Sequence, residues 1–524
     1  MFWADNVAKQ IIEKFGERRE YVIVTGTSMS GEPHIGNASD LIRGEAVRIA
    51  LNDLGKKAKL IWVSDDMDPF RSVPLGFPEE FKDYLGFPVS MVPDPHGCHE
   101  SFARHYELLF LNQLKDLEIR PKPYFGIEMY RKGMYNKSLR KAVELRKEIM
   151  KVLNKYKKEP LPENWYPFNI ICEKCHRIST TKVVTCDGIE AEYFCDPQET
   201  ILHKKYIVRG CGYRGKVNIL DGNAKLAWRV EWPARWAFLK CVCEPFGKEH
   251  AAHGGSWDTG KELVKLFGWE APVPVIYEHI QVMGEKMSKS KGNVITIPML
   301  LEVMSAPEIK FWLNFGKITK AKDINLRDLP LHNAFEFDKA EKIFFGVYST
   351  NNPREDLNYK RAYEISTNKE FHRPLNLEYD FAALLSQLFG CKLEKVKNVL
   401  IRTGHYQGNG ETDRRIKLRL KNAFNWVQKY APENYRLKGE GTKVELNELE
   451  ARQFRELMKV IEEVEDSEVL QQRIYEVARI GDVKEFFRKC YLALIGKGEG
   501  PRLANLIIAL GKKEVVKRLG RSLE

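Results

Sequence analysis

The feature that most constrains the fold is a strand, a glycine-rich loop, a helix and a second strand in direct succession near the start of the chain. Residues 21–25 form a β-branched apolar run that ends at Gly26 and is typical of a buried strand. Pro33 suits the first turn of a helix, and apolar residues then recur at helical spacing until Gly55. Residues 60–63 form a second apolar strand. This succession predicts a right-handed βαβ unit with a parallel sheet.

The regular alternation of strands and helices breaks after residue 75. Pro-rich turns, a His/Cys cluster, a helix near 136–156 and a Cys-rich segment follow, which indicates a long insertion. A buried strand resumes at 274–277, and a Gly/Lys/Ser loop comes after it. Beyond residue 300 apolar residues recur at helical spacing with short connections, which predicts an antiparallel helical bundle. A chain of 524 residues is also too long for one compact core.

Clustered cysteines within the insertion predict a metal site. Ten cysteines in a long intracellular chain are not typical of a disulfide framework, and most of them lie between residues 172 and 241. A C-x-x-C knuckle with two further thiolates from downstream strands suits tetrahedral zinc. The predicted ligands are Cys172, Cys175, Cys195 and Cys211. His176 or Cys186 could replace one of them, and Cys195 or Cys211 could instead be a buried thiol.

A second group of metal-ligating side chains precedes the first. The candidate ligands are Asp94, Cys98, His99 and His105. Cys98 and His105 are seven residues apart, which places them on one face of a helix. The alternative is a polar, turn-rich surface loop. Cys241 and Cys243 are poorly spaced for chelation, and we expect them to be packed thiols.

Two loops are suited to binding a phosphate group. Residues 26–36 lead from a parallel strand into a helix, whose free N–H groups and dipole attract anions. Small residues there allow a ligand to approach the backbone, and His34 can add a donor. Residues 286–292 place three lysines and two hydroxyls on a glycine-bounded segment. Taken singly, His34 could be a cap or packed residue and the second loop a solvated basic loop.

Together the two loops resemble the paired signatures of class I aminoacyl-tRNA synthetases. The first signature of that class is His-Ile-Gly-His, and residues 34–37 match it except for Asn37. The second is Lys-Met-Ser-Lys-Ser, which residues 286–290 match in full. Each lies in its expected context, between a strand and a helix or after the last strand of the sheet. Asn37 can donate a hydrogen bond but carries no charge, which changes its share of phosphate stabilisation.

The resemblance implies a reaction in which an amino acid carboxylate attacks the α-phosphate of ATP and pyrophosphate leaves. The nucleophile is already anionic, so the protein needs only to position the reactants and neutralise charge. The resemblance implies as catalytic residues His34, Asn37, Lys286 and Lys289. The ATP-binding residues that the resemblance implies are Pro33, His34, Gly36, Asn37, Asp258, Lys286, Ser288 and Lys289. Mg²⁺ would accompany ATP, and any Zn²⁺ would be structural because this chemistry does not need it.

Further segments narrow the resemblance to the class I lysyl-tRNA synthetases, which occur mainly in archaea and some bacteria. These segments are residues 30–37, 226–232 and 254–258. The implied activity is a ligase that forms lysyl-adenylate and transfers lysine to the 2′-hydroxyl of the terminal adenosine of tRNA(Lys). The implied lysine pocket consists of Gly26, Ser28, Asp65, Trp228, His250 and Tyr277.

A lysine side chain suits such a pocket because its apolar stem packs on aromatic rings while its ammonium needs an acceptor. Asp65, Asp66 and Glu231 are the candidate acids, and the sequence does not choose among them. The alternative substrate is glutamate, as in the related glutamyl enzymes of class I. Its carboxylate would need a cation, for which the candidates are Arg43, Arg71 and Arg229.

The expected fold is an α/β Rossmann-like catalytic domain with a zinc-binding insertion, followed by an all-α C-terminal region. The expected boundaries are 1–75 and 226–300 for the two halves of the catalytic domain, 76–225 for the connective insertion, 301–390 for a helical stem-contact or linker region, and 391–524 for an α-helical anticodon-binding region.

Charge agrees with a nucleic-acid partner, since the net charge of +12 suits a polyanion. Basic and aromatic residues interleave between Lys392 and Lys429, as they do in proteins that hold single-stranded RNA loops. A solvated helix face with core aromatics, Trp426 above all, would give the same pattern. We find neither an apolar run that could span a membrane nor a secretory signal, so we expect a cytoplasmic protein without a membrane partner.

Two other classes of protein would explain part of this sequence. A nucleotidyltransferase of the same superfamily, without tRNA, would not need the long C-terminal helical region. A zinc-dependent RNA-binding protein without catalysis would leave the loop at 286–290 unexplained. Amino-acid-dependent exchange of pyrophosphate into ATP separates these classes from a synthetase.

Overall fold

The computed structural model describes residues 1–287, 293–406, 408, 410–437, 439 and 441–524, which form two units. Unit 1 comprises Met1–Pro298 and Leu313–Ile324. Unit 2 comprises Met299–Trp312 and Asn325–Glu524. Ser288 and Lys289, two of the expected ATP-binding residues, lie outside the described residues.

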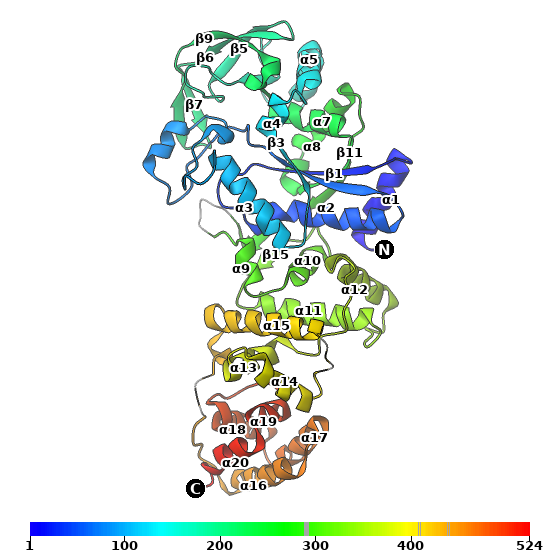
Figure 1. The fold of residues 1–524 in the computed structure, drawn as a ribbon, viewed down its shortest axis with the longest axis vertical. Coiled ribbons are helices and arrows are strands. Elements are labelled where there is room, and N and C mark those ends of the chain that lie inside the picture. Colours follow the sequence, from blue (N-terminus) through cyan, green and yellow to red (C-terminus); the bar gives the residue numbers. More distant parts are fainter. Residues whose placement is uncertain (288–292, 407, 409, 438, 440) are drawn as a thin grey trace. The chain divides into compact units, whose positions relative to one another are not determined.

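Unit 1 is built on a sheet of five parallel strands in the order β12-β11-β1-β2-β3. Figure 1 labels β1, β3 and β11 of this sheet. The strands are β1 (Tyr21–Thr27), β2 (Ala58–Ser64), β3 (Lys122–Phe125), β11 (Cys241–Gly247) and β12 (Val273–Tyr277). Helix α2 (Ile35–Asp53) connects β1 to β2, which pair in parallel along their whole length. The predicted βαβ unit is therefore confirmed.

Helices cover both faces of this sheet. Side chains of a strand point alternately to opposite faces. On one face, Gly44 of α2 packs so closely that an added Cβ atom would come within 2.7 Å of Leu60. On the other face, Val24 shares a core with Trp236 of α7 (Trp228–Leu239). Helix α1 (Trp3–Phe15) packs against α2, and α8 (Ser256–Leu266) packs against α7.

Two strands of the sheet differ from the sequence-based expectation. Strand β3 pairs with β2 although it lies inside 76–225, the range predicted to be an insertion. Strand β11 lies between β1 and β12 although Glu244 and Pro245 interrupt its apolar run. All of β11 is buried, and Cys241 and Cys243 are packed thiols as expected.

The rest of 76–225 forms helices and small antiparallel sheets. Its helices are α3 (Phe102–Asp116), α4 (Gly126–Arg131), α5 (Asn136–Glu144) and α6 (Arg146–Asn154). Its paired strands are β4 (Phe168–Ile170) with β10 (Ala224–Leu226), β5 (Thr181–Cys186) with β6 (Glu190–Cys195) and β9 (Arg214–Asn218), and β7 (Glu199–Leu202) with β8 (Tyr206–Arg209). A further small sheet in unit 1 joins β13 (Ile280–Val282), β14 (Glu285–Lys286) and β15 (Lys322–Ile324).

Unit 2 is helical throughout its described residues, which confirms the helical C-terminal region. Helices α9 (Ile297–Leu301) and α10 (Ala306–Asn314) lie where the chain passes between the units. The other helices are α11 (Leu329–Phe344), α12 (Pro353–Ser366), α13 (Tyr379–Phe389), α14 (Leu393–Arg402), α15 (Gly410–Lys429), α16 (Glu448–Glu463), α17 (Ser467–Ala478), α18 (Val483–Ile495), α19 (Leu503–Leu510) and α20 (Lys512–Gly520).

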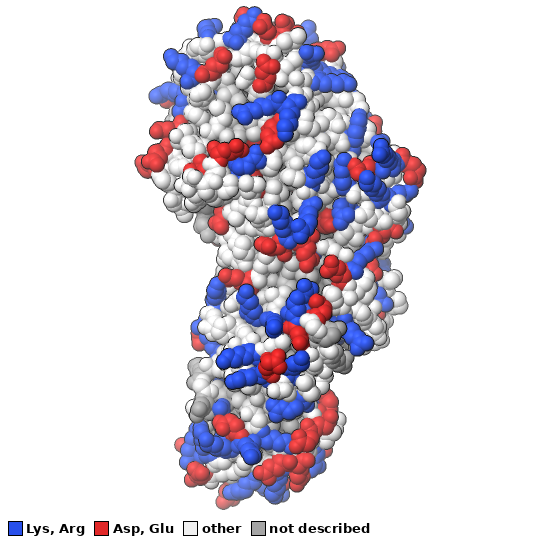
Figure 2. All heavy atoms as spheres, viewed as in Figure 1, with Lys and Arg blue, Asp and Glu red and all other residues white. Residues whose placement is uncertain are grey.

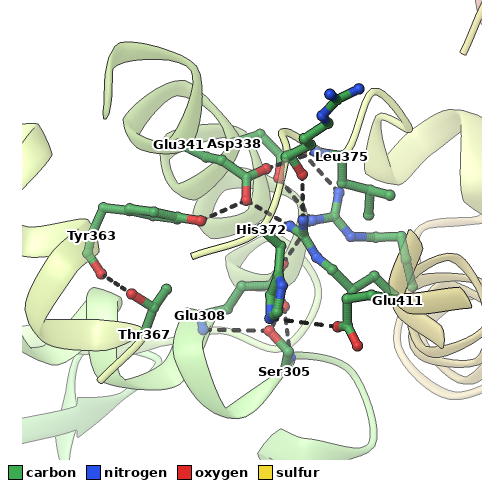
Figure 3. Close-up of polar contacts among 12 residues, drawn as sticks. Ser305, Glu308, Asp338, Glu341, Tyr363, Thr367, His372, Leu375 and Glu411 are labelled. Atoms are coloured by element: carbon green, nitrogen blue, oxygen red, sulfur yellow. Dashed lines mark hydrogen bonds and ion pairs between the residues drawn. The ribbon is translucent and has the colours of Figure 1, made fainter. Parts of the chain in front are cut away.

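Buried ion pairs connect the first helices of unit 2 (Figure 3). Arg419 of α15 donates to both carboxylate oxygens of Asp338 on α11, each at 2.8 Å. The same guanidinium contacts Glu308 at 3.2 Å. Arg415 pairs with Glu341 at 2.7 Å. Arg415 and Arg419, two of the basic residues considered for RNA binding, thus form ion pairs within the protein.

Trp426 of α15 is fully buried, and its indole N–H donates to the carbonyl of Leu326 at 3.1 Å. It belongs to the core of unit 2. On the face shown in Figure 2, basic and acidic side chains are mixed over the surface. None of the helices among the described residues combines the length and the apolar content needed to cross a membrane.

Candidate functional site

A cavity of about 230 Å³ lies at the carboxyl ends of β1, β11 and β12. Gly26 lines it from β1, Gly247 from β11 and Tyr277 from β12. The N-terminus of α2 and Lys286 line the same cavity. Ligands of open α/β sheets bind at this edge, so the cavity is the candidate active site.

His34 and Asn37 shape the N-terminus of α2. His34 is the extended residue before the helix, and its backbone N–H donates to Oδ1 of Asn37 at 3.0 Å. This is the reciprocal arrangement of a capping box, in which the third helical residue reaches back. Both residues line the cavity, where free helix N–H groups favour an anion. Asn37 therefore caps the helix in addition to facing the cavity.

Lys286 reaches the cavity from β14, and its Nζ lies 3.4 Å from Nε2 of His279. The chain after the loop returns to α2, because the backbone N–H of Ile35 donates to the carbonyl of Ile295 at 3.1 Å. A Cβ atom on Gly36 would lie 3.1 Å from Cε of Met287, so glycine allows this close approach. The first loop and the described start of the second, Lys286 and Met287, thus line one cavity.

Aromatic rings form a wall of the cavity. Trp228 and Trp232 lie one turn apart on α7 and stack with ring centroids 5.5 Å apart. His250 lies 5.5 Å from the Trp232 ring, and burial lowers its pKa. A largely apolar surface of this kind suits an aliphatic chain. Trp228 and His250, both predicted pocket residues, line the cavity together.

Tyr277, another predicted pocket residue, points its hydroxyl at Asp40. The hydroxyl donates to Oδ1 of Asp40 at 2.5 Å. The guanidinium carbon of Arg43 lies 4.2 Å from the centroid of the Tyr277 ring. Burial raises the pKa of Asp40 to about 7 in spite of these two neighbours.

The three acids proposed from the sequence are engaged elsewhere. Asp65 pairs with Arg235, Asp66 accepts the backbone N–H of Ile127 at 2.6 Å, and Glu231 pairs with Lys225. Among the described residues that line the cavity, none of these acids is present. Gly26, another residue of the predicted pocket, lines the cavity. A Cβ atom added at Gly26 would come within 2.8 Å of Nη1 of Arg235.

Three other predicted residues lie outside the described lining of the cavity, namely Ser28, Pro33 and Asp258. Thr27, the neighbour of Ser28, lines the cavity instead. Asp258 lies in the first turn of α8, where it accepts the backbone N–H of Gly254 at 2.9 Å and pairs with Lys261 at 3.0 Å. These contacts make Asp258 a support for the turn before α8.

Sequence reasoning missed Glu244, which lies in β11 and lines the cavity with only 3% of its surface exposed. Its Oε1 accepts the indole N–H of Trp232 at 2.9 Å, and its Oε2 accepts that of Trp236. Burial raises its pKa to about 8. The available signal was a carboxylate within a strand, but Glu244 and Pro245 interrupt the apolar run by which that strand could have been recognised.

The predicted cysteine cluster comes together beside the β5–β6–β9 sheet. Sγ of Cys172 lies 3.6 Å from that of Cys211, and Sγ of Cys175 lies 3.6 Å from that of Cys195. The four sulfur atoms all lie within 4.8 Å of one another. Cys186 is outside this group, and its sulfur accepts the backbone N–H of Gly188.

The second predicted cluster also comes together. Sγ of Cys98 lies 3.1 Å from Nδ1 of His99 and 3.3 Å from Nδ1 of His105. Asp94 lies within 3.6 Å of both imidazoles. The four ligand atoms lie within 4.8 Å of one another, so both clusters have the dimensions of a metal site.

Known proteins match this chain over its whole length. A family model described as "tRNA synthetases class I (K)" matches residues 1–369. A "Lysine--tRNA ligase" of Pyrococcus horikoshii is 38% identical, and one of Pyrococcus furiosus 39% identical, each covering 99% of both chains. A solved glutamate tRNA ligase from Elizabethkingia meningosepticum matches with a TM-score of 0.39 and 16% identity, over 96% of this chain and 99% of that chain.

Proposed function

Because the chain belongs to the class I (K) family of tRNA synthetases, we propose that it is a lysine–tRNA ligase. It activates lysine with ATP to give lysyl-adenylate and then transfers lysine to the 2′-hydroxyl of the terminal adenosine of tRNA(Lys). The observation that carries this proposal is that one cavity joins the N-terminus of α2 and Lys286 to an aromatic wall. As a ligase that serves translation, the protein would act in the cytoplasm.

The residues on the α2 side of the cavity would serve the ATP reaction. The lysine carboxylate attacks the α-phosphorus, the bond to the bridging oxygen breaks, and pyrophosphate leaves with that oxygen. His34, Asn37 and Lys286 line the cavity and would neutralise charge on the phosphate oxygens, with Lys289 as a further candidate. Mg²⁺ would accompany the triphosphate. Pro33, Gly36, Ser288 and Asp258 complete the proposed ATP site.

The residues on the aromatic side would hold lysine. Gly26, Trp228, His250 and Tyr277 line the cavity, and Ser28 and Asp65, which are not among its described lining residues, are the remaining candidates. The aromatic rings would pack on the methylene stem of lysine.

Glutamate is disfavoured as the substrate because no arginine is among the described residues that line the cavity. Arg43 lies over the Tyr277 ring, Arg71 lies 3.9 Å from Asp68, and Arg229 donates to the carbonyl of Gly254 at 2.9 Å. The relatives that match the whole chain are lysine ligases.

We further propose zinc at the two clusters. Four thiolates fit tetrahedral Zn²⁺, and one carboxylate, one thiolate and two imidazoles are also ligand types that Zn²⁺ binds. Both sites would be structural. Within the chain we propose residues 1–75 and 226–300 as the catalytic halves, 76–225 as the connective insertion, 301–390 as the stem-contact region and 391–524 as the anticodon-binding region.

The test of the function is exchange of labelled pyrophosphate into ATP by the purified protein, with lysine or glutamate and with or without tRNA. We expect lysine alone to support exchange and tRNA(Lys) to be charged. If glutamate supports exchange and lysine does not, the substrate is misassigned. If no amino acid supports exchange in either condition, the enzyme class is misassigned.

A further inference from the structure

The ammonium group of bound lysine needs a carboxylate that water does not screen. An exposed carboxylate attracts an ammonium only weakly, whereas a buried one binds it strongly and discriminates by charge. The three acids proposed from the sequence are paired with other groups and lie outside the described lining of the cavity. The carboxylate that receives the ammonium group is therefore expected among the acids that line the cavity.

Three acids line the cavity, namely Asp40, Glu244 and Glu249. The Glu249 side chain is 49% exposed and lies 3.5 Å from His279, so water screens it. Asp40 accepts the Tyr277 hydroxyl and has the cationic Arg43 as a neighbour, so a positive charge already offsets its own. Glu244 is the only one of the three that is both buried and free of an ion pair among the described residues.

The surroundings of Glu244 hold its carboxylate in place, and the nearby cation Arg235, which lowers its pKa, already pairs with Asp65. The two oxygens of Glu244 accept N–H groups from Trp232 and Trp236, and an indole N–H donates without carrying charge. Trp232 and Phe246 lie edge to face, 5.3 Å apart, and both line the cavity beside Glu244. A fixed carboxyl group that can ionise beside a bound cation, next to apolar rings, is complementary to a flexible methylene chain that ends in a cation.

We propose that Glu244 is the specificity-determining residue that receives the ε-ammonium of lysine, an inference that rests on the proposed lysine–tRNA ligase function. Trp232 and Trp236 act as positioning residues because they orient the carboxylate. The same carboxyl group offers no positive charge to the side chain of glutamate, which explains how one pocket accepts lysine and rejects an acidic amino acid. Burial raises the pKa of Glu244, as expected for a buried carboxylate that has no cation paired with it.

The test replaces Glu244 by Gln, which keeps the shape and removes the charge. The matched control is Glu278→Gln, since Glu278 lies between two lining residues in sequence but pairs with Lys248 at 2.8 Å. Lysine-dependent exchange is measured together with inhibition by 6-hydroxynorleucine, in which a hydroxyl replaces the ammonium. We expect Glu244→Gln to lower kcat/KM for lysine on the order of 100-fold or more, because a buried charge loses its partner. Inhibition by the analogue and the KM for ATP should stay within about threefold, and Glu278→Gln should behave as wild type.

Equal losses for lysine and for the neutral analogue would overturn the proposal, because they would indicate a general defect of the pocket. Unchanged kcat/KM for lysine would overturn it as well. If Glu244→Gln does not fold, the wild-type protein is used instead. Calorimetry at pH 7 in two buffers of different ionisation enthalpy then measures how many protons are released when each ligand binds. Lysine should then release a proton that 6-hydroxynorleucine does not release, and equal proton counts would contradict the proposal. Failure of the wild-type protein to use lysine at all is a different result, since it rejects the proposed function itself.

Discussion

At the scale of single residues, the charges that the site can offer to a ligand are those that are not already in ion pairs within the protein. Arg235 has Asp65 as its partner and Lys225 has Glu231, so these buried charges stabilise the sheet edge and are not available to a ligand. Lys286 and Glu244 differ from them. Lys286 contacts only a histidine ring among the described residues, and Glu244 contacts two neutral indoles. Lys286 and Glu244 are thus the two lining residues that we propose to meet the phosphates of ATP and the ammonium group of lysine.

Replacing Lys286 by Ala should slow adenylate formation while leaving lysine affinity nearly unchanged. Loss of one preorganised charge beside the developing phosphate charge typically costs on the order of 10² to 10³ in rate. Single-turnover adenylate formation and equilibrium lysine binding measure the two quantities separately. Lys248→Ala is the control, because Lys248 is exposed and does not line the cavity. A large loss of lysine affinity with a normal single-turnover rate would contradict the role given to Lys286.

The raised pKa of Glu244 predicts a pH dependence of stability. An acid whose pKa is higher in the folded protein than in the unfolded chain binds more protons when folded, so its contribution to stability falls as pH rises. The pKa of about 8 stands against a reference of 4.5, so the loss should occur between these two values. The nearby Arg235 lowers this pKa and Asp40 raises it, but burial dominates.

The measurement is the thermal midpoint of wild type and Glu244→Gln from pH 5 to pH 8 without ligand. The wild-type midpoint should fall relative to the variant as pH rises, and added lysine should remove the difference. Parallel curves would mean that Glu244 keeps an ordinary pKa.

At the scale of elements, the first half of the sheet could be predicted because its strands are continuous apolar runs and its helix has a clear start. Strand β11 could not be predicted because Glu244 and Pro245 break its apolar pattern, and burial against α7 overrides that local signal. Strand β3 is short and partly exposed, so it leaves no apolar run to detect. The sequence predicted which residues come together in both candidate metal clusters. It did not predict Glu244 as the proposed lysine acceptor, because that choice depends on which acids form ion pairs in the folded protein.

In unit 2, replacing Arg419 by Met should destabilise the helices that it connects. The change leaves the carboxylates of Asp338 and Glu308 buried without their cation, which typically costs about 3–5 kcal/mol. Arg414→Met on the same helix is the control, since that arginine is 73% exposed and its pair with Glu411 is worth little. Denaturant unfolding followed by circular dichroism measures both variants. Equal effects of the two changes would show that the pairs in Figure 3 do not hold α15 to α11.

In the insertion, replacing Cys175 by Ser should remove one bound zinc ion and loosen residues 165–220. Small antiparallel strands form this segment, and metal binding can supply folding energy that their limited core lacks. Zinc content, hydrogen exchange across the segment and lysine-dependent exchange are measured together, with Cys186→Ser as the control. Adenylate formation should suffer only indirectly. If activity followed zinc content while the fold stayed intact, the zinc would be catalytic instead.

At the scale of the whole molecule, the net charge of +12 agrees with a tRNA partner, but part of the basic stretch in α14 and α15 is internal. The exposed lysines of α15, Lys417 and Lys421, remain available for phosphate contacts. Reversing both charges to Glu should weaken tRNA binding and reduce the salt dependence of the binding constant by about one per lost contact. Filter binding at several salt concentrations measures this. Lysine-dependent exchange without tRNA should not change, and unaltered tRNA binding would place the RNA elsewhere on the molecule.

The pair of indoles on Glu244 has an optical consequence for the intact protein. The emission of a tryptophan depends on the charge beside its N–H group, and here two rings share one carboxylate. Arrival of a cation at that carboxylate changes the electric field at both rings at once. If Glu244 receives the ammonium group of lysine as proposed, the tryptophan emission of the protein should therefore change when lysine binds, before any ATP is consumed and without an added label.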